Sequence, residues 1–292
     1  MVDSGRFTFP AVPAVLLSIV SVQGGAAIAK GLFPVLGPAG TTSLRVGISA
    51  LVLLLVVRPQ LGRLSGAQWR AVVPYGLALG LMNLLFYFAL ARIPLGLAVT
   101  LEFVGPLGLA LAGSRRWADA VWALLAAAGI ALIAPWHSQG IDLLGLAFAL
   151  AAGGAWAVYI VLGQRTAAVL PGQQAVAIGM LFAALPVLPF GVASGSLLGL
   201  TPHLLLLGGL LALFSSVLPF SLEMQALRTL PTRTFSILMS LEPVAAAISG
   251  WLLLGERLLL GQWLAVGFIV VASLGATLTA GAGPAVPAVG GE

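Results

Sequence analysis

The sequence predicts an all-α integral membrane protein with ten transmembrane helices arranged as two inverted five-helix repeats. Three observations lead to this fold class. Hydrophobic residues make up 60% of the 292 residues and charged residues only 7%, whereas soluble proteins carry about 25% charged residues. The apolar residues fall into runs of about 20, the length of a helix that crosses a bilayer. A unit of sequence also occurs twice.

The two copies of this unit lie at residues 82–113 and 219–256. Shifting the chain by 137 residues places Pro106 on Pro243. Each copy has an apolar run, an arginine, a proline and a second apolar run that a proline interrupts. Because each half holds an odd number of spans, the second half should enter the membrane in the opposite direction from the first. Many secondary transporters use this arrangement to build two gates around a central site.

The apolar runs of the first half are separated by short basic or proline-containing gaps. They cover about residues 10–29, 41–57, 71–91, 95–112 and 118–135. The first run has an alternative interpretation as a cleaved signal peptide, because residues 27–29 have the small-x-small pattern of a cleavage site. The pair Gly24-Gly25 argues against cleavage, since Gly153-Gly154 occupies the same place in the second half.

The second half repeats this pattern. Its runs cover about residues 142–162, 173–191, 201–226, 232–253 and 259–279. We therefore expect the first repeat at residues 1–137 and the second at 138–280. The remaining residues, 281–292, are mostly Gly, Ala and Pro, and we expect this tail to be disordered.

Basic residues predict the orientation, because cytoplasmic loops of membrane proteins are enriched in Lys and Arg. With both termini in the cytoplasm, nine of the 13 Lys and Arg residues lie inside, and four lie outside or in the outer halves of the spans. We therefore expect a multi-pass protein of the inner (cytoplasmic) membrane. The net charge of +5 is explained by these topology signals, and no nucleic-acid partner is expected.

The composition also limits the chemistry. The chain has no cysteine, and its two histidines, His137 and His203, are far apart in sequence. A thiolate nucleophile, a Cys-based metal site and a His-rich metal site are therefore not expected. We expect neither a cofactor nor an enzymatic activity, because no clustered carboxylate motif is present either.

Three glutamates interrupt runs that otherwise read as membrane spans: Glu102, Glu223 and Glu242. An ionisable side chain in the middle of a bilayer costs about 2.5–3.5 kcal/mol on insertion scales, so such residues usually serve a function or have a partner. A glutamate can carry a proton across the membrane or hold the ammonium group of an amino acid. The alternatives are a structural hydrogen bond and, for Glu223, contact with Arg228 or solvent.

Lys30 and Arg45 are the complementary candidates, since an ammonium or a guanidinium can hold a substrate carboxylate. Their alternative role is to extend toward the outer membrane interface. Neutral side chains that could line a polar cavity, or simply pack, are Gln23, Asn83, Tyr87, Trp156 and Tyr159. Pro106, Pro219 and Pro243 lie beside the three glutamates and are expected to kink the helices there.

At these residues the chain resembles the drug/metabolite transporter superfamily of the EamA type. More narrowly, it is similar to the bacterial threonine/homoserine exporters. The resemblance covers about residues 10–280 and is carried by the blocks 21–37, 87–111, 153–165 and 221–243. Many superfamily members have a tryptophan where this chain has Gln23-Gly24-Gly25, and this departure favours the exporter branch.

The resemblance implies export of small neutral or hydroxylated amino acids across the cytoplasmic membrane, in exchange for protons. It places Glu102, Glu223 and Glu242 in family-like blocks. Three alternatives remain at this point: a transporter of another metabolite or drug, an integral membrane enzyme, and a channel. Substrate competition would distinguish a transporter of another metabolite or drug from an amino-acid exporter. The missing catalytic motifs argue against an enzyme, and saturable flux would argue against a channel.

Overall fold

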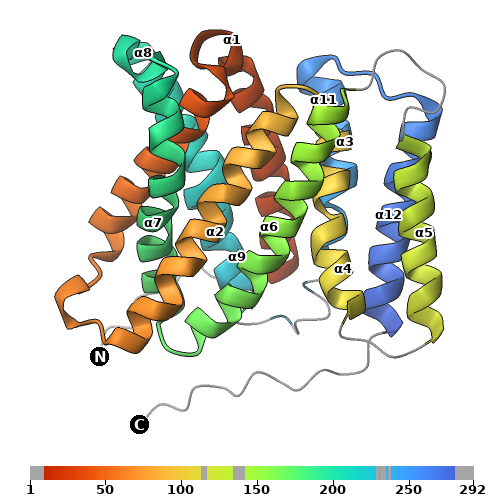
Figure 1. Ribbon diagram of the computed structural model, residues 1–292, viewed down its shortest axis with the longest axis horizontal. Coiled ribbons are helices and arrows are strands. Elements are labelled where there is room, and N and C mark those ends of the chain that lie inside the picture. The colour runs from red at the N-terminus through yellow and green to blue at the C-terminus, as the bar shows by residue number, and fades with distance from the viewer. Residues whose placement is uncertain are drawn as a thin grey trace.

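The computed structural model describes residues 10–112, 117–133, 142–227, 230, 235 and 238–279. In these residues all regular secondary structure is helical, which confirms the all-α prediction, and the helices form one bundle (Figure 1). Among the described residues, five helices are long and apolar enough to cross a membrane: α1 (Ala11–Val57), α2 (Gly66–Leu90), α6 (Leu143–Ala167), α7 (Gly172–Ala193) and α12 (Leu260–Thr279).

Shorter segments complete the bundle: α3 (Leu95–Glu102), α4 (Val104–Ala112), α5 (Trp117–Ile133), α8 (Pro202–Ala212), α9 (Leu218–Leu227) and α11 (Glu242–Leu254). A π-helical turn, Leu213–Val217, joins α8 to α9, and short 3₁₀ turns occur at Leu61–Arg63 and Ser196–Gly199. The expected boundary between the repeats at residues 137 and 138, and the tail at 281–292, lie outside the described residues. The layout of ten helices in two inverted repeats stays a prediction.

Helix α1 unites the first two predicted runs into one element of 47 residues. It bends at Gly37, whose backbone angles are φ 62° and ψ 171°. Only glycine adopts a positive φ readily, because it has no Cβ. The two runs are therefore two arms, residues 11–36 and 38–57, that meet at one glycine. Ala14, Val15 and Ser18 of the first arm are fully buried, so this arm packs into the bundle.

Prolines break two runs that the sequence predicts as single helices. The run at 95–112 is divided at Phe103 into α3 and α4, because Pro106 has no N–H to donate to the carbonyl of Glu102. The run at 201–226 contains the π-helical turn, since Pro219 likewise cannot donate to the carbonyl of Ser215.

Pro243 also lies where its apolar run is interrupted. The sequence suggests a kink inside one helix, with Glu242 near its middle. Residues 238–239 are helical and 240–241 form a turn. Helix α11 then begins at Glu242, and Pro243 lies in its first turn. A proline is tolerated there because the first N–H groups of a helix have no partner within it.

Glycines allow the helices to approach closely around the α3–α4 break. A Cβ on Gly105 of α4 would collide with the backbone of Gly153 in α6. A Cβ on Gly96 of α3 would lie 2.6 Å from Cα of Ala247 in α11. Contact of this kind between small residues is how helices associate in membranes, where apolar burial gives little driving force. It holds α3, α4, α6 and α11 together.

The two ends of the bundle differ. Helices α6, α9 and α12 end where α1 begins, and we call this the lower end, as it lies in Figure 1. Contacts of Ala14 and Val15 in α1 with Ala226 in α9 belong to this end. The turns after α2 and after α11 lie at the opposite, upper end.

Asp142 marks the beginning of α6 at the upper end. Its Oδ1 accepts hydrogen bonds from the N–H groups of Leu144 and Gly145. Arg92, just after α2, donates to Asp142 Oδ2 at 2.6 Å, so these two helices are joined across the bundle surface. The hydrogen bond from Arg92, aided by the backbone N–H groups, holds the pKa of Asp142 below its ordinary value.

Substitution of Gly153 tests the tight packing at the α3–α4 break. In Gly153→Ala the new Cβ lies 2.5 Å from the carbonyl oxygen of Glu102, which is backbone and cannot move away cheaply. We expect the free energy of unfolding to fall by about 1–3 kcal/mol, as is usual for overpacking. The neighbouring Gly154→Ala is the matched control, because no atom lies within 4 Å of its Cβ. Titration with a denaturing detergent should separate the two variants, and equal losses would contradict this account of the packing.

Candidate functional site

A cavity of about 660 Å³ lies within the bundle. Its walls come from α1, α2, α3, α4, α6, α7, the π-helical turn, α9, α11 and α12. Gln164, which lines the cavity near the end of α6, is exposed. Glu223 of α9 and Thr277 of α12 also line it near the lower ends of their helices. The cavity therefore reaches from the middle of the bundle toward the lower end.

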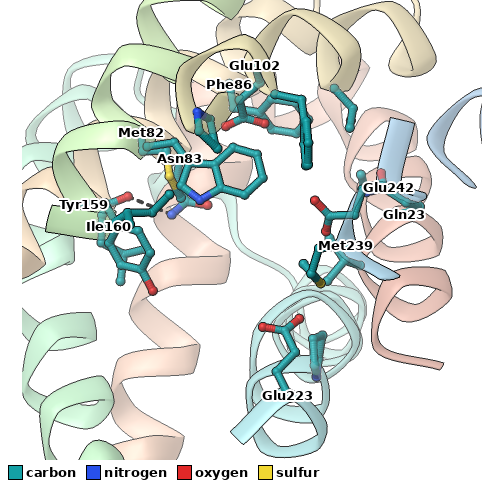
Figure 2. A pocket seen from close by; sticks show the side chains of 18 of the residues that line it. Gln23, Met82, Asn83, Phe86, Glu102, Tyr159, Ile160, Glu223, Met239 and Glu242 are labelled. Carbon is teal, nitrogen blue, oxygen red and sulfur yellow. Dashed lines mark hydrogen bonds between the residues drawn. The ribbon is translucent and has the colours of Figure 1, made fainter. Parts of the chain in front are cut away.

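All three glutamates singled out in the sequence line this cavity. Figure 2 shows the carboxyl groups of Glu102, Glu223 and Glu242 pointing into one open space. Glu102 is 8% exposed and Glu242 is 6% exposed, whereas Glu223 is half-buried. Glu102 is the last residue of α3 and Glu242 the first of α11, so both carboxyls emerge where a proline interrupts the apolar run.

Glu223 has a described partner that the sequence did not suggest. Ser18 of α1 donates its hydroxyl to Glu223 Oε1 at 2.5 Å. This contact ties the first arm of α1 to α9 near the lower end of the bundle. The alternative partner considered from the sequence, Arg228, lies outside the described residues.

Arg45 lies in the cavity wall and not at the membrane interface. Its side chain is buried, donates from Nη2 to Asn83 Oδ1, and lies 4.9 Å from the centre of the Tyr87 ring. Asn83 is itself oriented by donating to the carbonyl of Leu79 at 2.7 Å. Within the described ranges, no carboxylate lies within ion-pair distance of Arg45. The guanidinium charge is thus positioned by neutral groups.

Lys30 is the one predicted site residue that does not line the cavity. Its Nζ lies 2.5 Å from Glu256 Oε1 and donates to the carbonyl of Ile93 at 3.1 Å. The other carboxylate oxygen of Glu256 accepts from the N–H of Leu95 at 2.8 Å. This network, which we call the upper ion pair, joins α1, the α2–α3 turn and the α11–α12 turn.

The backbone of the α11–α12 turn places Glu256. Gly255 adopts a left-handed conformation with φ 66°, and the N–H of Glu256 bonds to the carbonyl of Gly250. This is a common way for a helix to end. A Cβ on Gly250 would lie 2.5 Å from Glu256 Oε2, so a larger residue there would make the carboxylate shift. Glu256 could not be selected from the sequence, because it follows the last apolar residues of its run and a partner 226 positions away leaves no local pattern.

Aromatic residues form the wall opposite Glu242. Tyr159 of α6 stacks on Tyr75 of α2 with ring centres 4.9 Å apart, and their hydroxyls are 3.2 Å apart. Trp156 meets Phe103 edge to face, next to the α3–α4 break. Asn83, Tyr87, Trp156 and Tyr159 therefore all line the cavity, as does Gln23.

Ser215 and Ser216 also line the cavity and were not selected from the sequence. They lie in the π-helical turn, where Ser21 of α1 donates to the carbonyl of Phe214 at 2.6 Å. Two adjacent serines four and three residues before a proline, inside an apolar run, are the sequence signal that could have revealed them.

Comparison with known proteins agrees with this architecture. Residues 143–278 match the sequence profile of the EamA-like transporter family. The chain is 46% identical over 266 residues to the threonine/homoserine exporter RhtA of Escherichia coli K12, covering 90% of each chain. The chain belongs to the EamA-like transporter family. It is also 45% identical to RhtA of Salmonella typhimurium LT2, again over 90% of both chains.

Membership in the EamA-like transporter family makes the chain a multi-pass membrane transporter and not an enzyme. The fold itself has a solved counterpart. A crystal structure of another protein superposes with a TM-score of 0.56 at 19% sequence identity, covering 92% of this chain and 98% of the other. At that identity the likeness concerns the fold alone.

A double-mutant cycle tests the upper ion pair. We expect Lys30→Met and Glu256→Gln to show a coupling free energy of about 1–3 kcal/mol, as groups in one network do. The physical reason is that the side chains of Lys30 and Glu256 are only 26% and 13% exposed. Unfolding of the single and double variants in detergent measures it. The more exposed Arg92–Asp142 pair is the control and should show a weaker coupling; a Lys30–Glu256 coupling no larger than that would contradict the network.

Proposed function

We propose that this protein exports small amino acids, threonine and homoserine foremost, from the cytoplasm in exchange for protons. The observation that carries the proposal is one cavity with a buried guanidinium and three carboxyl groups in its walls. The relatives that cover most of the chain are named threonine/homoserine exporters, which supports this substrate class.

The charges of the cavity are complementary to a zwitterion. A planar guanidinium such as that of Arg45 binds carboxylates through two parallel hydrogen bonds. Asn83 and the Tyr87 ring hold it in place. The ammonium group of the substrate would then face Glu102 or Glu242. A cavity of about 660 Å³ lies within the usual range for small-molecule sites, about 300–1,000 Å³.

Proton exchange follows from the cost of leaving a charge alone in a medium of low polarity. While an ammonium group is bound, a glutamate beside it is compensated. When the substrate leaves, that carboxylate loses its partner, and binding a proton restores neutrality. A glutamate that is shared between ammonium and proton therefore couples the two fluxes in opposite directions. Glu102, Glu242 and Glu223 are the candidates for this role.

Alternating access completes the proposal. We propose that residues 1–137 and 138–280 are two inverted five-helix repeats, that both termini are cytoplasmic, and that the protein resides in the inner membrane. The lower end, where Gln164 and Glu223 reach the cavity, then faces the cytoplasm. The upper ion pair is made by segments of both proposed repeats. It would separate when the cavity opens to the other side.

Transport in liposomes tests the glutamates. Vesicles containing the purified protein are loaded with labelled threonine, and efflux is measured with and without a pH gradient. We expect saturable efflux that the gradient accelerates and homoserine competes. In Glu102→Gln and Glu242→Gln, gradient-driven efflux should fall by about 100-fold or more, because removing one member of a buried charge pair costs about 3–5 kcal/mol.

The control for these variants is Asp142→Asn, which makes the same carboxyl-to-amide change outside the cavity and should retain transport. Full gradient-driven efflux by Glu102→Gln or Glu242→Gln would remove that residue from the mechanism. No movement of threonine by folded wild-type protein would discard the proposed substrate and leave a transporter of another small metabolite or drug.

Substitution of Arg45 tests carboxylate binding. In Arg45→Gln we expect the KM for threonine to rise by about tenfold or more, since hydrogen bonds to charged groups contribute about 1.5–3 kcal/mol. Threonine amide, which lacks the carboxylate, should compete with threonine poorly in the wild type and equally well before and after the substitution. The exposed Arg58, just after the same helix, provides the control Arg58→Gln. An unchanged KM in Arg45→Gln would assign the carboxylate to another group.

A further inference from the structure

Gln23 is a buried polar residue whose side-chain oxygen receives no hydrogen bond from the described part of the bundle. Its side chain is 2% exposed and lines the cavity from the first arm of α1. In the described part of the chain, its Oε1 has no hydrogen-bond partner. Leaving a buried acceptor unpaired is unfavourable, so about 90% or more of buried polar groups have a partner. A group of this kind in a cavity wall is a place where a ligand can bind.

The other neutral polar groups of the cavity are mostly occupied by protein contacts. Asn83 holds Arg45 and bonds to Leu79. Tyr159 pairs with the hydroxyl of Tyr75. Thr277 donates to the carbonyl of Ser273 at 2.9 Å. These side chains shape the site, but their hydrogen-bonding capacity is already used in part.

Two further hydroxyls, of Tyr87 and Ser215, are buried without a partner in hydrogen-bond geometry among the described residues. They lie near each other, and the Tyr87 ring underlies Arg45. They therefore belong to the part of the cavity where the proposed carboxylate subsite lies. Gln23 is in a different place: Figure 2 shows it beside Glu242 and across the cavity from Asn83.

This position matches the chemistry of a hydroxylated amino acid. When the substrate carboxylate faces Arg45 and the ammonium faces Glu242, the side chain begins at the carbon next to the ammonium-bearing carbon. A hydroxyl on that carbon, as in threonine, or on the next one, as in homoserine, then lies on the Glu242 side of the cavity. The Gln23 carboxamide offers both an acceptor and donors, so it can pair with a hydroxyl, which also donates and accepts.

We propose that the Gln23 carboxamide hydrogen-bonds the side-chain hydroxyl of the substrate and so selects hydroxylated amino acids over apolar ones of the same shape. This inference rests on the proposed amino-acid export and names its specificity-determining residue. A site with a buried hydrogen-bonding group discriminates strongly against an analogue that leaves the group unpaired, whereas an apolar pocket discriminates weakly.

Threonine and valine provide the test, because they differ only by a hydroxyl in place of a methyl group. The ratio of their Vmax/KM values is measured in liposomes for the wild type, Gln23→Met and Gln23→Glu. Met approximates the shape of Gln without a strong hydrogen bond, whereas Glu keeps an oxygen acceptor. We expect the threonine-to-valine ratio to fall about tenfold in Gln23→Met, as for the loss of one hydrogen bond, through the KM for threonine. The preference for threonine over valine should persist in Gln23→Glu.

Transport of valine by Gln23→Met shows that the variant is folded and active, so the ratio separates specificity from general damage. Ser215→Ala is the comparison variant and should leave the ratio within about twofold, since it removes a hydroxyl elsewhere in the wall. An unchanged ratio in Gln23→Met, or a collapse in Ser215→Ala alone, would overturn the proposal. If Gln23→Met carries neither threonine nor valine, the ratio in Gln23→Glu decides. A threonine-to-valine ratio like that of the wild type supports the inference, and a ratio near one overturns it. Absence of amino-acid transport by the wild type would instead overturn the proposed function.

Discussion

The low polarity of the bilayer is the constraint on which this structure depends. A charged side chain inside it is stable only next to a partner or a polar cavity. The buried ionisable residues obey this rule in two ways. Glu102, Glu242 and Arg45 converge on one cavity, whereas Lys30 and Glu256 neutralise each other at the upper end. The interior of the bundle therefore contains a polar site and, apart from it, an end where the charges are paired.

Helix breaks bring the polar groups to the site. A continuous helix satisfies its own backbone and presents side chains at regular intervals. At Pro106 and Pro219 this regularity is lost, because these prolines cannot donate to the carbonyls of Glu102 and Ser215. At Pro243 a helix starts, with Glu242 as its first residue. The same prolines that interrupt the helices thus bring carboxyl and hydroxyl side chains together in one region. Close contacts at Gly105 and Gly153 keep that region compact.

The asymmetry of the bundle gives the site a direction. The cavity reaches the lower end at Gln164 and Glu223, while the upper ion pair joins three segments at the other end. An ion pair is well suited to a contact that, under the proposed alternating access, both forms and separates. Its attraction is largest when water is excluded, and each partner regains hydration when they part. A purely apolar seal between helices gains less from such a change, because lipid is as apolar as the seal itself.

Much of this protein follows from its sequence alone. Composition and the length of the apolar runs determine the helical membrane class, since so many apolar residues are stable only when lipid surrounds them. The cost of an intramembrane charge was enough to select Glu102, Glu223, Glu242 and Arg45, all of which line the cavity.

Tertiary structure decided the rest, because it depends on which residues meet across long separations. Lys30 resembles Arg45 in sequence, yet it pairs with Glu256, 226 positions away, and stays outside the cavity. Gln23 is one of several neutral polar residues in the sequence, and only the packing around it leaves its Oε1 without a partner among the described residues. Periodicity reports the environment of a residue along one helix, whereas pairing is determined by the contacts between helices.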